Sequence, residues 1–420
     1  MANSIYQWGG KVKTETSAFK PFKFKGSGFE YFKIWIVNVL LIVLTLGIYY
    51  PWAKVRNKKY FYANSILDGR HFEYHASGKQ LLIGYLIGVA FVFTSIIAQE
   101  VFTQAIFIFS MIFFCSIPWI IYSSMKFNRR MTSFSKVHFS FNGTIKESYI
   151  YFFFYPFIFL LSLYFFPIVS AIFLPDILQN PDLSWISYLL PIFALFTLFF
   201  TLYMYALMKK KIITYRLNKT HYGEGKFTST LKATKFMMIA LKTIFLALFF
   251  IGVFLGIIGL VMYELKGFDS LIALQTTAEN FLASPYSFIM GSKLLDILPL
   301  LSIVFSFLLV FLLALSYIIA KQRSYVYSQT KLDDKIIFSS TVQFKSLFWV
   351  IVSNMFLLII TLGLVFPWTK VRMVRFLLEN TKIDASFGMN EYLSQKRKEQ
   401  SALEEEIGGD SFDLDVGIGI

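Results

Sequence analysis

Six long apolar runs place the strongest constraint on what this chain can fold into. Each run holds at least 19 mostly apolar residues, which as a helix is enough to cross a hydrocarbon layer of roughly 30 Å. Of the 420 residues, 56% are hydrophobic and only 15% are charged, so a soluble fold could not cover the apolar surface. The sequence therefore predicts an all-α polytopic membrane protein with six long transmembrane helices. The predicted spans are about 80–98, 101–122, 149–174, 185–208, 236–262 and 294–320.

Basic residues gather on one side of these predicted spans. The basic segments, with six, five, eight and five Lys or Arg in turn, are 51–79, 123–147, 209–235 and 321–345. The alternate connections 99–100 and 175–184 have none, and 263–293 has only two. By the positive-inside rule the basic loops face the cytoplasm. The net charge of +15 therefore predicts contact with anionic membrane lipids, and no nucleic-acid partner.

A stretch near the N-terminus returns near the C-terminus. Residues 38–56 and 354–372 are identical at ten of nineteen positions, and both contain Thr-Leu-Gly followed by Pro-Trp-x-Lys-Val-Arg. The copies belong to two short apolar runs, 34–50 and 346–366. Such a pattern is too specific for general hydrophobicity to produce twice, so it indicates internal symmetry.

Two membrane arrangements of these short runs stay open. The 17 residues of 34–50 span about 25 Å as one helix, which is short for a crossing. A re-entrant hairpin at each run would keep the basic ends, 1–33 and 370–420, in the cytoplasm with the other basic segments. A tilted full crossing would place both ends outside. The charge distribution favours the hairpin.

A weaker repeat divides the chain into about five units. Each unit joins a Phe-x-aromatic or Phe-x-polar segment to one apolar run or a pair of runs, and the units are 22–64, 72–128, 139–218, 227–328 and 338–380. The alternation predicts small extended or strand segments at the cytoplasmic surface. A single membrane domain, 30–395, is expected between a basic cytoplasmic N-terminus, 1–29, and a flexible acidic tail, 396–420.

Polar residues in the repeated stretches are the candidates for a substrate or ion site. Asn38 and Asn354 occupy equivalent positions, as do Thr45 and Thr361 at the Thr-Leu-Gly breaks. Lys242 is the one basic residue inside a predicted span, where ionisable groups often mark function. The alternatives are an interhelical hydrogen bond or cap for the Asn and Thr residues, and snorkelling for the lysine.

Basic residues just after the repeated Trp are candidates for lipid phosphate. Lys54 with Arg56, and Lys370 with Arg372, emerge at the predicted membrane interface. Each charge near an anionic surface is worth on the order of 1 kcal/mol. The alternative is that these residues only set the topology.

Catalysis and metal binding find little support. His71 and His75 enclose Glu73, but the order is not the His-Glu-x-x-His of a zinc helix, and a third ligand is lacking. Cys115 is the only cysteine, which excludes an intrachain disulfide and a multi-cysteine zinc site. We expect no catalytic residue, cofactor or metal site, and no enzymatic activity.

The motifs together resemble a known family. The opening Phe22-Lys-Phe24-Lys-Gly26, the Thr-Leu-Gly…Pro-Trp-x-Lys-Val-Arg element and the step from Asn64 to Asp68 resemble the YjgN-like family of bacterial inner-membrane proteins, of unknown function. The resemblance covers about 20–390. It implies a multi-pass protein of the bacterial inner (cytoplasmic) membrane, and it supplies no substrate, cofactor or catalytic residue.

Two classes of function follow from these features. We expect a transporter or channel-like protein with a site between the two Thr-Leu-Gly/Pro-Trp elements, because broken helices at corresponding positions of two halves often form such sites. The alternative is a non-enzymatic membrane scaffold or lipid-organising protein with a basic cytoplasmic face and a membrane protease as partner. The sequence predicts no oligomeric state.

Overall fold

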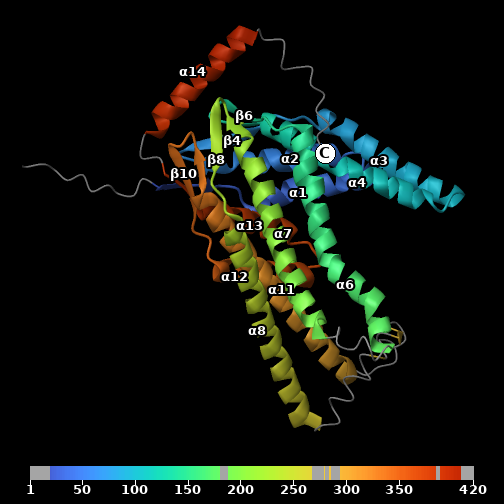
Figure 1. Ribbon diagram of the computed structural model, residues 1–420. Coiled ribbons are helices and arrows are strands. Elements are labelled where there is room, and N and C mark those ends of the chain that lie inside the picture. Colours follow the sequence, from blue (N-terminus) through green and yellow to red (C-terminus); the bar gives the residue numbers. More distant parts are fainter. Residues whose placement is uncertain are drawn as a thin grey trace, which may run out of the picture.

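Helices and short strands alternate along the whole chain (Figure 1). The computed structural model describes residues 19–179, 188–266, 294–384 and 388–407, together with the single residues 279, 283 and 284. Most of the predicted N-terminal region, the end of the acidic tail and parts of the connections 175–184 and 263–293 lie outside the described residues.

Among the described residues, the helices up to Glu379 form five consecutive pairs. The pairs are α1 (Gly28–Leu44) with α2 (Tyr50–Ala63), α3 (Gly78–Val101) with α4 (Ala105–Arg130), α5 (Ile145–Tyr149), η1 (Ile150–Phe154) and α6 (Tyr155–Gln179) with α7 (Leu190–Asn218), α8 (Ala233–Lys266) with α11 (Leu294–Ser328), and α12 (Phe344–Ile360) with α13 (Phe366–Glu379). One more helix, α14 (Met389–Ile407), follows them. Six helical segments are long and apolar enough to cross a membrane, which confirms the six predicted spans.

A β-hairpin connects each helix pair to the next. The strands are β3 (Ser65–Leu67) and β4 (Arg70–Tyr74), β5 (Thr132–Phe134) and β6 (Val137–Phe141), β7 (Thr220–Tyr222) and β8 (Gly225–Ser229), and β9 (Thr330–Leu332) and β10 (Ile336–Ser340). The last helix pair is followed by β11 (Thr381–Asp384), and the first is preceded by β1 (Phe19–Pro21) and β2 (Lys23–Phe24). All pairings between neighbouring strands are antiparallel.

These strands form one ring that is nearly closed. The 11-stranded sheet has the order β1-β11-β10-β9-β8-β7-β6-β5-β4-β3-β2. Its two end strands, β1 and β2, are consecutive in the chain and flank Phe22. The segment 19–24 therefore pairs with β11 on one side and with β3 on the other. The Phe22 N–H also donates to the Thr381 carbonyl at 3.0 Å, so hydrogen bonding is continuous at the junction.

The predicted all-α fold class is therefore wrong. Short extended segments were expected, but not that they would join into one barrel-like sheet. Each strand has only two to five residues, which is too short for its periodicity to be distinguished from an irregular loop. Pairing all of them in a ring removes the exposed edges that such strands would otherwise leave.

The same helix-to-strand junction is built in every unit. The first residue of β3, β5, β7, β9 and β11 is Ser or Thr, and its hydroxyl donates to the carbonyl four residues earlier, at the end of the preceding helix. The five bonds are Ser65 to Phe61, Thr132 to Asn128, Thr220 to Arg216, Thr330 to Val326 and Thr381 to Leu377, at 2.7–2.8 Å. A hydroxyl that satisfies an otherwise unpaired helix carbonyl stops the helix at a fixed residue.

Helix pairs also pack around a ring. The second helix of each pair packs on the first helix of the next pair, and α13 packs on α1 to complete the circle. The long helices form two groups: α3 and α4 project to one side, while α6, α7, α8 and α11 extend away from the sheet (Figure 1).

The Pro-Trp motif makes one of these contacts between units. A Cβ atom on Gly78, at the start of α3, would lie 2.3 Å from Cδ1 of Trp52. A Cβ atom on Gly28, at the start of α1, would lie 2.2 Å from Cδ1 of Trp368. Each repeated Trp thus packs against a glycine of the next unit around the ring, where any side chain would clash.

Both short apolar runs are helical hairpins. The α1–α2 hairpin begins after β2 and ends before β3, which is its paired neighbour, so both of its ends lie at the sheet. The α12–α13 hairpin likewise connects the paired strands β10 and β11. Two ends at the same sheet are what a re-entrant hairpin requires, because a single membrane crossing would place the two ends of each run on opposite sides.

The Thr-Leu-Gly motif forms the tip of each hairpin. Leu46 and Gly47 have φ values of 49° and 92°, in the left-handed region where glycine is favoured. The Thr45 hydroxyl donates to the Leu41 carbonyl at 2.7 Å and accepts from the Tyr49 N–H at 3.0 Å, which caps the break from both sides. The second copy has the same pattern at Thr361.

A flexible acidic tail was predicted from residue 396, and that boundary stays a prediction. In the structure α14 continues to Ile407. Lys396 is buried, as are Met389, Tyr392 and Leu393 in the first turns of the same helix.

Loss of a junction hydroxyl should destabilise the ring. In Thr330→Val the shape is kept but the 2.7 Å bond to the Val326 carbonyl is lost, which should lower the free energy of unfolding by about 1 kcal/mol. Thermal unfolding of the purified protein by circular dichroism measures the change. Thr228→Val, which removes only a 3.4 Å contact with Asp334, serves as the matched control. Equal melting temperatures for both variants and the parent would contradict a stabilising role for the junction.

Candidate functional site

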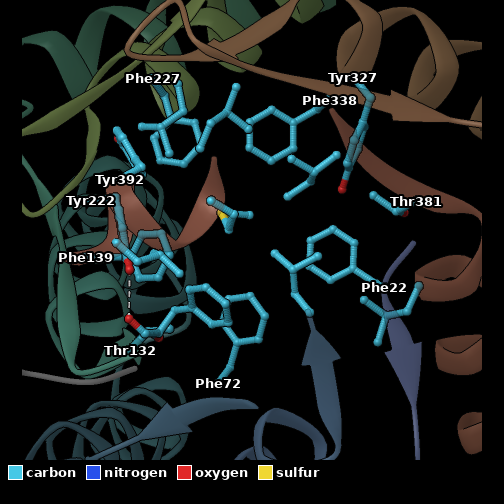
Figure 2. Close-up of a pocket in the computed structure, with 18 of the residues that line it drawn as sticks. Phe22, Phe72, Thr132, Phe139, Tyr222, Phe227, Tyr327, Phe338, Thr381 and Tyr392 are labelled. Atoms are coloured by element: carbon cyan, nitrogen blue, oxygen red, sulfur yellow. Dashed lines mark hydrogen bonds between the residues drawn. The ribbon is translucent and has the colours of Figure 1, made fainter. Parts of the chain in front are cut away.

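A cavity of about 460 Å³ lies inside the strand ring (Figure 2). One phenylalanine from each unit faces it, in the middle of the second strand of a hairpin or, in the first unit, between β1 and β2. These residues are Phe22, Phe72, Phe139, Phe227 and Phe338. Ring centroids of consecutive members are 6.2 Å apart for Phe22 and Phe72, and 5.9 Å apart for Phe227 and Phe338. The Phe-x-Phe alternation of the sequence therefore places one aromatic ring per unit inside the barrel.

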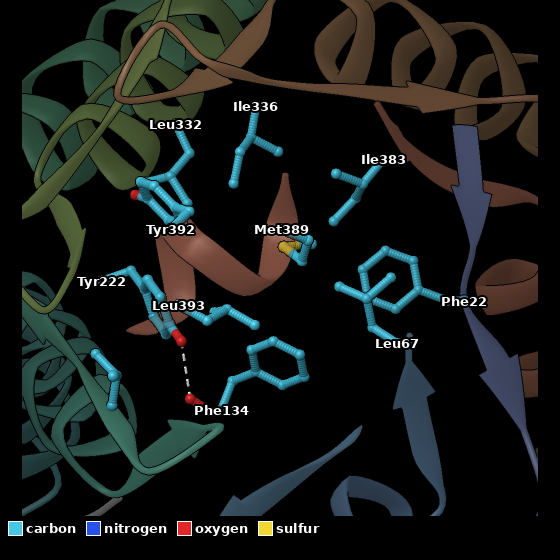
Figure 3. Close-up of a cluster of buried hydrophobic side chains, with 11 residues drawn as sticks. Phe22, Leu67, Phe134, Tyr222, Leu332, Ile336, Ile383, Met389, Tyr392 and Leu393 are labelled. Atoms are coloured by element: carbon cyan, nitrogen blue, oxygen red, sulfur yellow. Dashed lines mark hydrogen bonds between the residues drawn. The ribbon is translucent and has the colours of Figure 1, made fainter. Parts of the chain in front are cut away.

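A second layer of apolar side chains comes from the first strand of each hairpin (Figure 3). The third residue of β3, β5, β7, β9 and β11 is buried in every unit, and these residues are Leu67, Phe134, Tyr222, Leu332 and Ile383. Alternate residues of a strand point to the same face, so a Ser/Thr at the junction fixes the inward position two residues later. The two layers give the cavity a largely apolar wall.

Helix α14 covers the cavity at the hairpin-turn end of the ring (Figure 3). Met389, Tyr392 and Leu393 from its first turns belong to the same buried cluster as the second apolar layer. Figure 3 shows Met389 near the centre of the surrounding strand residues. In this conformation α14 acts as a plug.

Polar contacts hold the plug at the β9–β10 turn. The Lys396 ammonium lies 3.2 Å from the Asp333 carboxylate, and the Tyr392 hydroxyl donates to the same carboxylate at 2.8 Å. The Lys226 N–H donates to the other Asp333 oxygen at 2.8 Å. Burial alone would raise the pKa of Asp333, but the hydrogen bonds from Lys226, Tyr392 and Lys396 lower it below its usual value. Asp333 is therefore held in its charged form while the plug is docked.

Two other hairpins also form hydrogen bonds with the plug. At β4, Arg70 donates to the Asn390 side chain at 2.7 Å. At the β5–β6 turn, Arg397 donates to the Ser135 carbonyl at 2.8 Å. Together with Asp333, these contacts fix α14 to three hairpins of different units, which centres it on the ring.

The positively charged residues of the cavity wall lie at the end opposite α14. Arg129, near the end of α4, and Arg323, on α11, line the cavity there with Tyr62, Tyr327 and Thr381. Arg323 donates to the Thr381 hydroxyl at 2.8 Å, and its guanidinium lies 4.4 Å from the centre of the Tyr327 ring. A second cavity of about 390 Å³, bordered by α2, α11 and α13, shares Arg323 and Tyr327 with the first. The ring interior therefore continues into the space between the helices.

The predicted asparagines support their own hairpins. Asn38 donates to Asn57 at 3.2 Å, and Arg56 donates to Asn38 at 3.3 Å, all within α1 and α2. Asn354 donates to a backbone carbonyl of α13 at 3.3 Å and accepts from Arg372 at 3.2 Å, in the equivalent arrangement. Among the described contacts, none joins Asn38 to Asn354. A shared substrate or ion site at these residues stays a prediction.

The remaining predicted residues lie apart from the ring cavity. Thr45 and Thr361 cap the hairpin tips, and Lys242 is exposed on α8. Lys370 donates to the Tyr31 hydroxyl at 3.1 Å and, with Asn354, lines a separate cavity of about 500 Å³ at the α12–α13 hairpin.

Lipid phosphate contact by Lys54, Arg56, Lys370 and Arg372 stays a prediction. The contacts given above show that the two arginines also bind the hairpin asparagines. Lys370 contributes to packing between α13 and α1 through Tyr31.

The histidines considered for metal binding do not gather ligands. His75 lies 2.7 Å from the Ser133 hydroxyl, and its ring is 5.0 Å from that of His138. Within the described part of the chain, no group of three or more His, Cys, Asp or Glu side chains is close enough to hold a metal ion.

Sequence reasoning missed the site at Arg129, Arg323 and α14. The two arginines are close to the basic ends of long apolar helices, where the positive-inside rule already accounts for such residues. The available signal was the spacing: Arg129 precedes the junction Thr132 by three residues, and Arg323 precedes Thr330 by seven, so both lie on the helix faces that approach the ring.

Comparisons with known proteins identify the family. A family model for bacterial proteins of unknown function (DUF898) matches residues 19–409. Inner membrane protein YjgN of Escherichia coli K12 is 26% identical over 367 residues, which is 86% of this chain and 87% of that protein. Inner membrane protein YjgN of Salmonella typhimurium LT2 is 24% identical over 377 residues, 89% of this chain and 91% of that protein. No solved structure matches this chain.

These matches confirm the resemblance seen in the motifs. Because the relatives are inner membrane proteins and this chain has six apolar helices of sufficient length, it is a multi-pass protein of the inner membrane. The chain therefore belongs to the DUF898 family of bacterial proteins of unknown function.

Proposed function

We propose that this protein is a channel-like transport protein whose passage runs along the axis of the strand ring. The observation that carries the proposal is the cavity of about 460 Å³ to which all five units contribute a phenylalanine. A ring that only held the helices together would be expected to fill its centre with side chains, as small barrels do. Here the centre is hollow and continues toward the helices.

The repeated hairpins form walls of this passage. Tyr62 of α2, and Val374 and Leu378 of α13, border the second cavity between the helices. The proposed passage thus lies beside the two Thr-Leu-Gly/Pro-Trp elements, although on the ring axis rather than at Asn38 and Asn354. Their asparagines would serve it by keeping each hairpin rigid.

Helix α14 would be the gate. With the basic segments in the cytoplasm, the hairpin turns and α14 lie on the cytoplasmic side of the passage. Besides the buried Met389 and Leu393, hydrogen bonds and one ion pair hold the plug, and it can leave without breaking any strand pairing of the ring. The described conformation is the closed one.

Loosening the gate should open the passage. The double variant Asp333→Asn, Lys396→Gln loses the ion pair that holds α14, so a purified sample in a planar bilayer should conduct potassium chloride more often than the parent protein. Adding Phe227→Ala and Phe338→Ala widens the passage between the five inward phenylalanines, and should raise the conductance of each open channel.

The control replaces phenylalanines outside the ring. Phe311→Ala and Phe356→Ala alter side chains that are both 61% exposed on α11 and α12, and they should leave conduction as in the parent. Should no variant conduct above the empty bilayer, the passage is refuted and the scaffold alternative is favoured.

Acid should release the gate. Because the pKa of Asp333 is lowered in the docked state, docking gains stability that is present above the ordinary pKa of Asp and is lost as pH falls through the docked value. A spin label at Ser401→Cys, with Cys115→Ala, should therefore become mobile below about pH 4. At pH 7, Asp333→Asn should already give a more mobile label.

The matched control for this measurement is the neighbouring Asp334→Asn. Asp334 makes only a 3.4 Å contact with Thr228 and none of the described contacts of the plug, so the label should stay as immobile as in the parent at pH 7. An immobile label in Asp333→Asn would show that this carboxylate does not hold the plug.

A further inference from the structure

We propose that the ring cavity binds an amphiphilic organic anion, with its carboxylate or phosphate group at Arg129 and Arg323 and its apolar part among the ring phenylalanines. The inference rests on the proposed function, because it names the class of ligand that would occupy the passage.

The charge of the cavity wall is the first observation. Among the lining residues Arg129 and Arg323 are cationic, and none is Asp or Glu. Neither arginine forms an ion pair with any acidic side chain in the described residues. Arg216 is close enough to repel Arg129, which adds to the positive potential. Cations gathered at a cavity without a counter-charge are costly, and a bound anion would offset that cost.

An unused hydrogen-bond donor is the second observation. The Nε atom of Arg323 is buried and has no hydrogen-bond partner. Its Nη2 donates to the Thr381 hydroxyl and, at 3.3 Å, to the Leu377 carbonyl. Stacking on Tyr327 at 4.4 Å fixes the plane of the guanidinium. An oriented guanidinium with a free donor is the group that best binds planar carboxylate or tetrahedral phosphate oxygens.

The polarity gradient is the third observation. Tyr62, Tyr327 and Thr381, which carry hydroxyl groups, line the cavity together with the arginines. The ring phenylalanines and the plug residues Met389 and Leu393 form the other part of the wall (Figures 2 and 3). Its volume of about 460 Å³ is within the usual range for sites of small organic molecules. A simple ion would leave this apolar part of the wall without a partner.

A binding measurement with octanoate tests the site. Purified protein in phosphatidylcholine nanodiscs is dialysed against labelled octanoate, and empty nanodiscs give the background from lipid partition. Octanoate should bind saturably, and at least about tenfold more tightly than octanol, octylammonium or inorganic phosphate. In Arg129→Gln, Arg323→Gln the octanoate affinity should fall about 10- to 100-fold, because charge-assisted hydrogen bonds are lost.

Two further variants keep the test decisive. Lys331→Gln removes a charge from an exposed position of β9, outside the cavity, and should bind octanoate like the parent. If the double Arg variant does not fold, Phe227→Trp provides a second test, because it fills the apolar part of the cavity. It should weaken the binding of octanoate without changing the binding of inorganic phosphate.

The outcomes separate the ligand from the passage. Equal binding of octanol or octylammonium would overturn the anion site, and inorganic phosphate binding as tightly as octanoate would overturn the amphiphilic part. If the protein still conducts but does not bind octanoate, the anion site is refuted and the passage is not. Specific octanoate binding without conduction would support the site and refute the passage.

Discussion

Closure of the strand ring by residues 19–24 is the constraint on which the rest of the structure depends. This segment pairs with β11 through β1 and with β3 through β2, so the first and last units become neighbours. The helices repeat the closure where α13 packs on α1. Without the segment, two short strands would keep unpaired edges and the cavity would lie open on one side. The first residues described by the structure therefore hold together the whole array of units.

Each unit uses the same local chemistry although the helices differ in length. A Ser or Thr hydroxyl ends each helix pair. After the first four pairs, a short turn then reverses the chain and an inward phenylalanine follows on the next strand. The α1–α2 and α12–α13 hairpins are half the length of the longest helices, but they present the same junction to the ring. Helix length can vary because it changes only the part of each unit that lies away from the sheet.

The site depends on side chains that are unremarkable in their own segments. Arg129 and Arg323 resemble ordinary basic residues at the ends of membrane helices, and Met389 and Leu393 belong to a mainly polar helix. They acquire a role only where the ring brings them to one cavity. Asn38 and Asn354 show the opposite, because the repeat makes them conspicuous in the sequence. In the structure each forms a hydrogen bond within its own hairpin.

The sequence by itself determined the membrane class, the six long helices and the two-copy motif. These features are encoded by long apolar runs, by the placement of charges and by repeated motifs, and they can be recognised without information about contacts between distant residues. Only the tertiary structure decided that the strands form a ring, that α14 closes it and that two arginines face its interior. Strands of two to five residues gain their stability from partners such as Phe19 and Asp384, which are far apart in the chain, and no local pattern encodes that pairing.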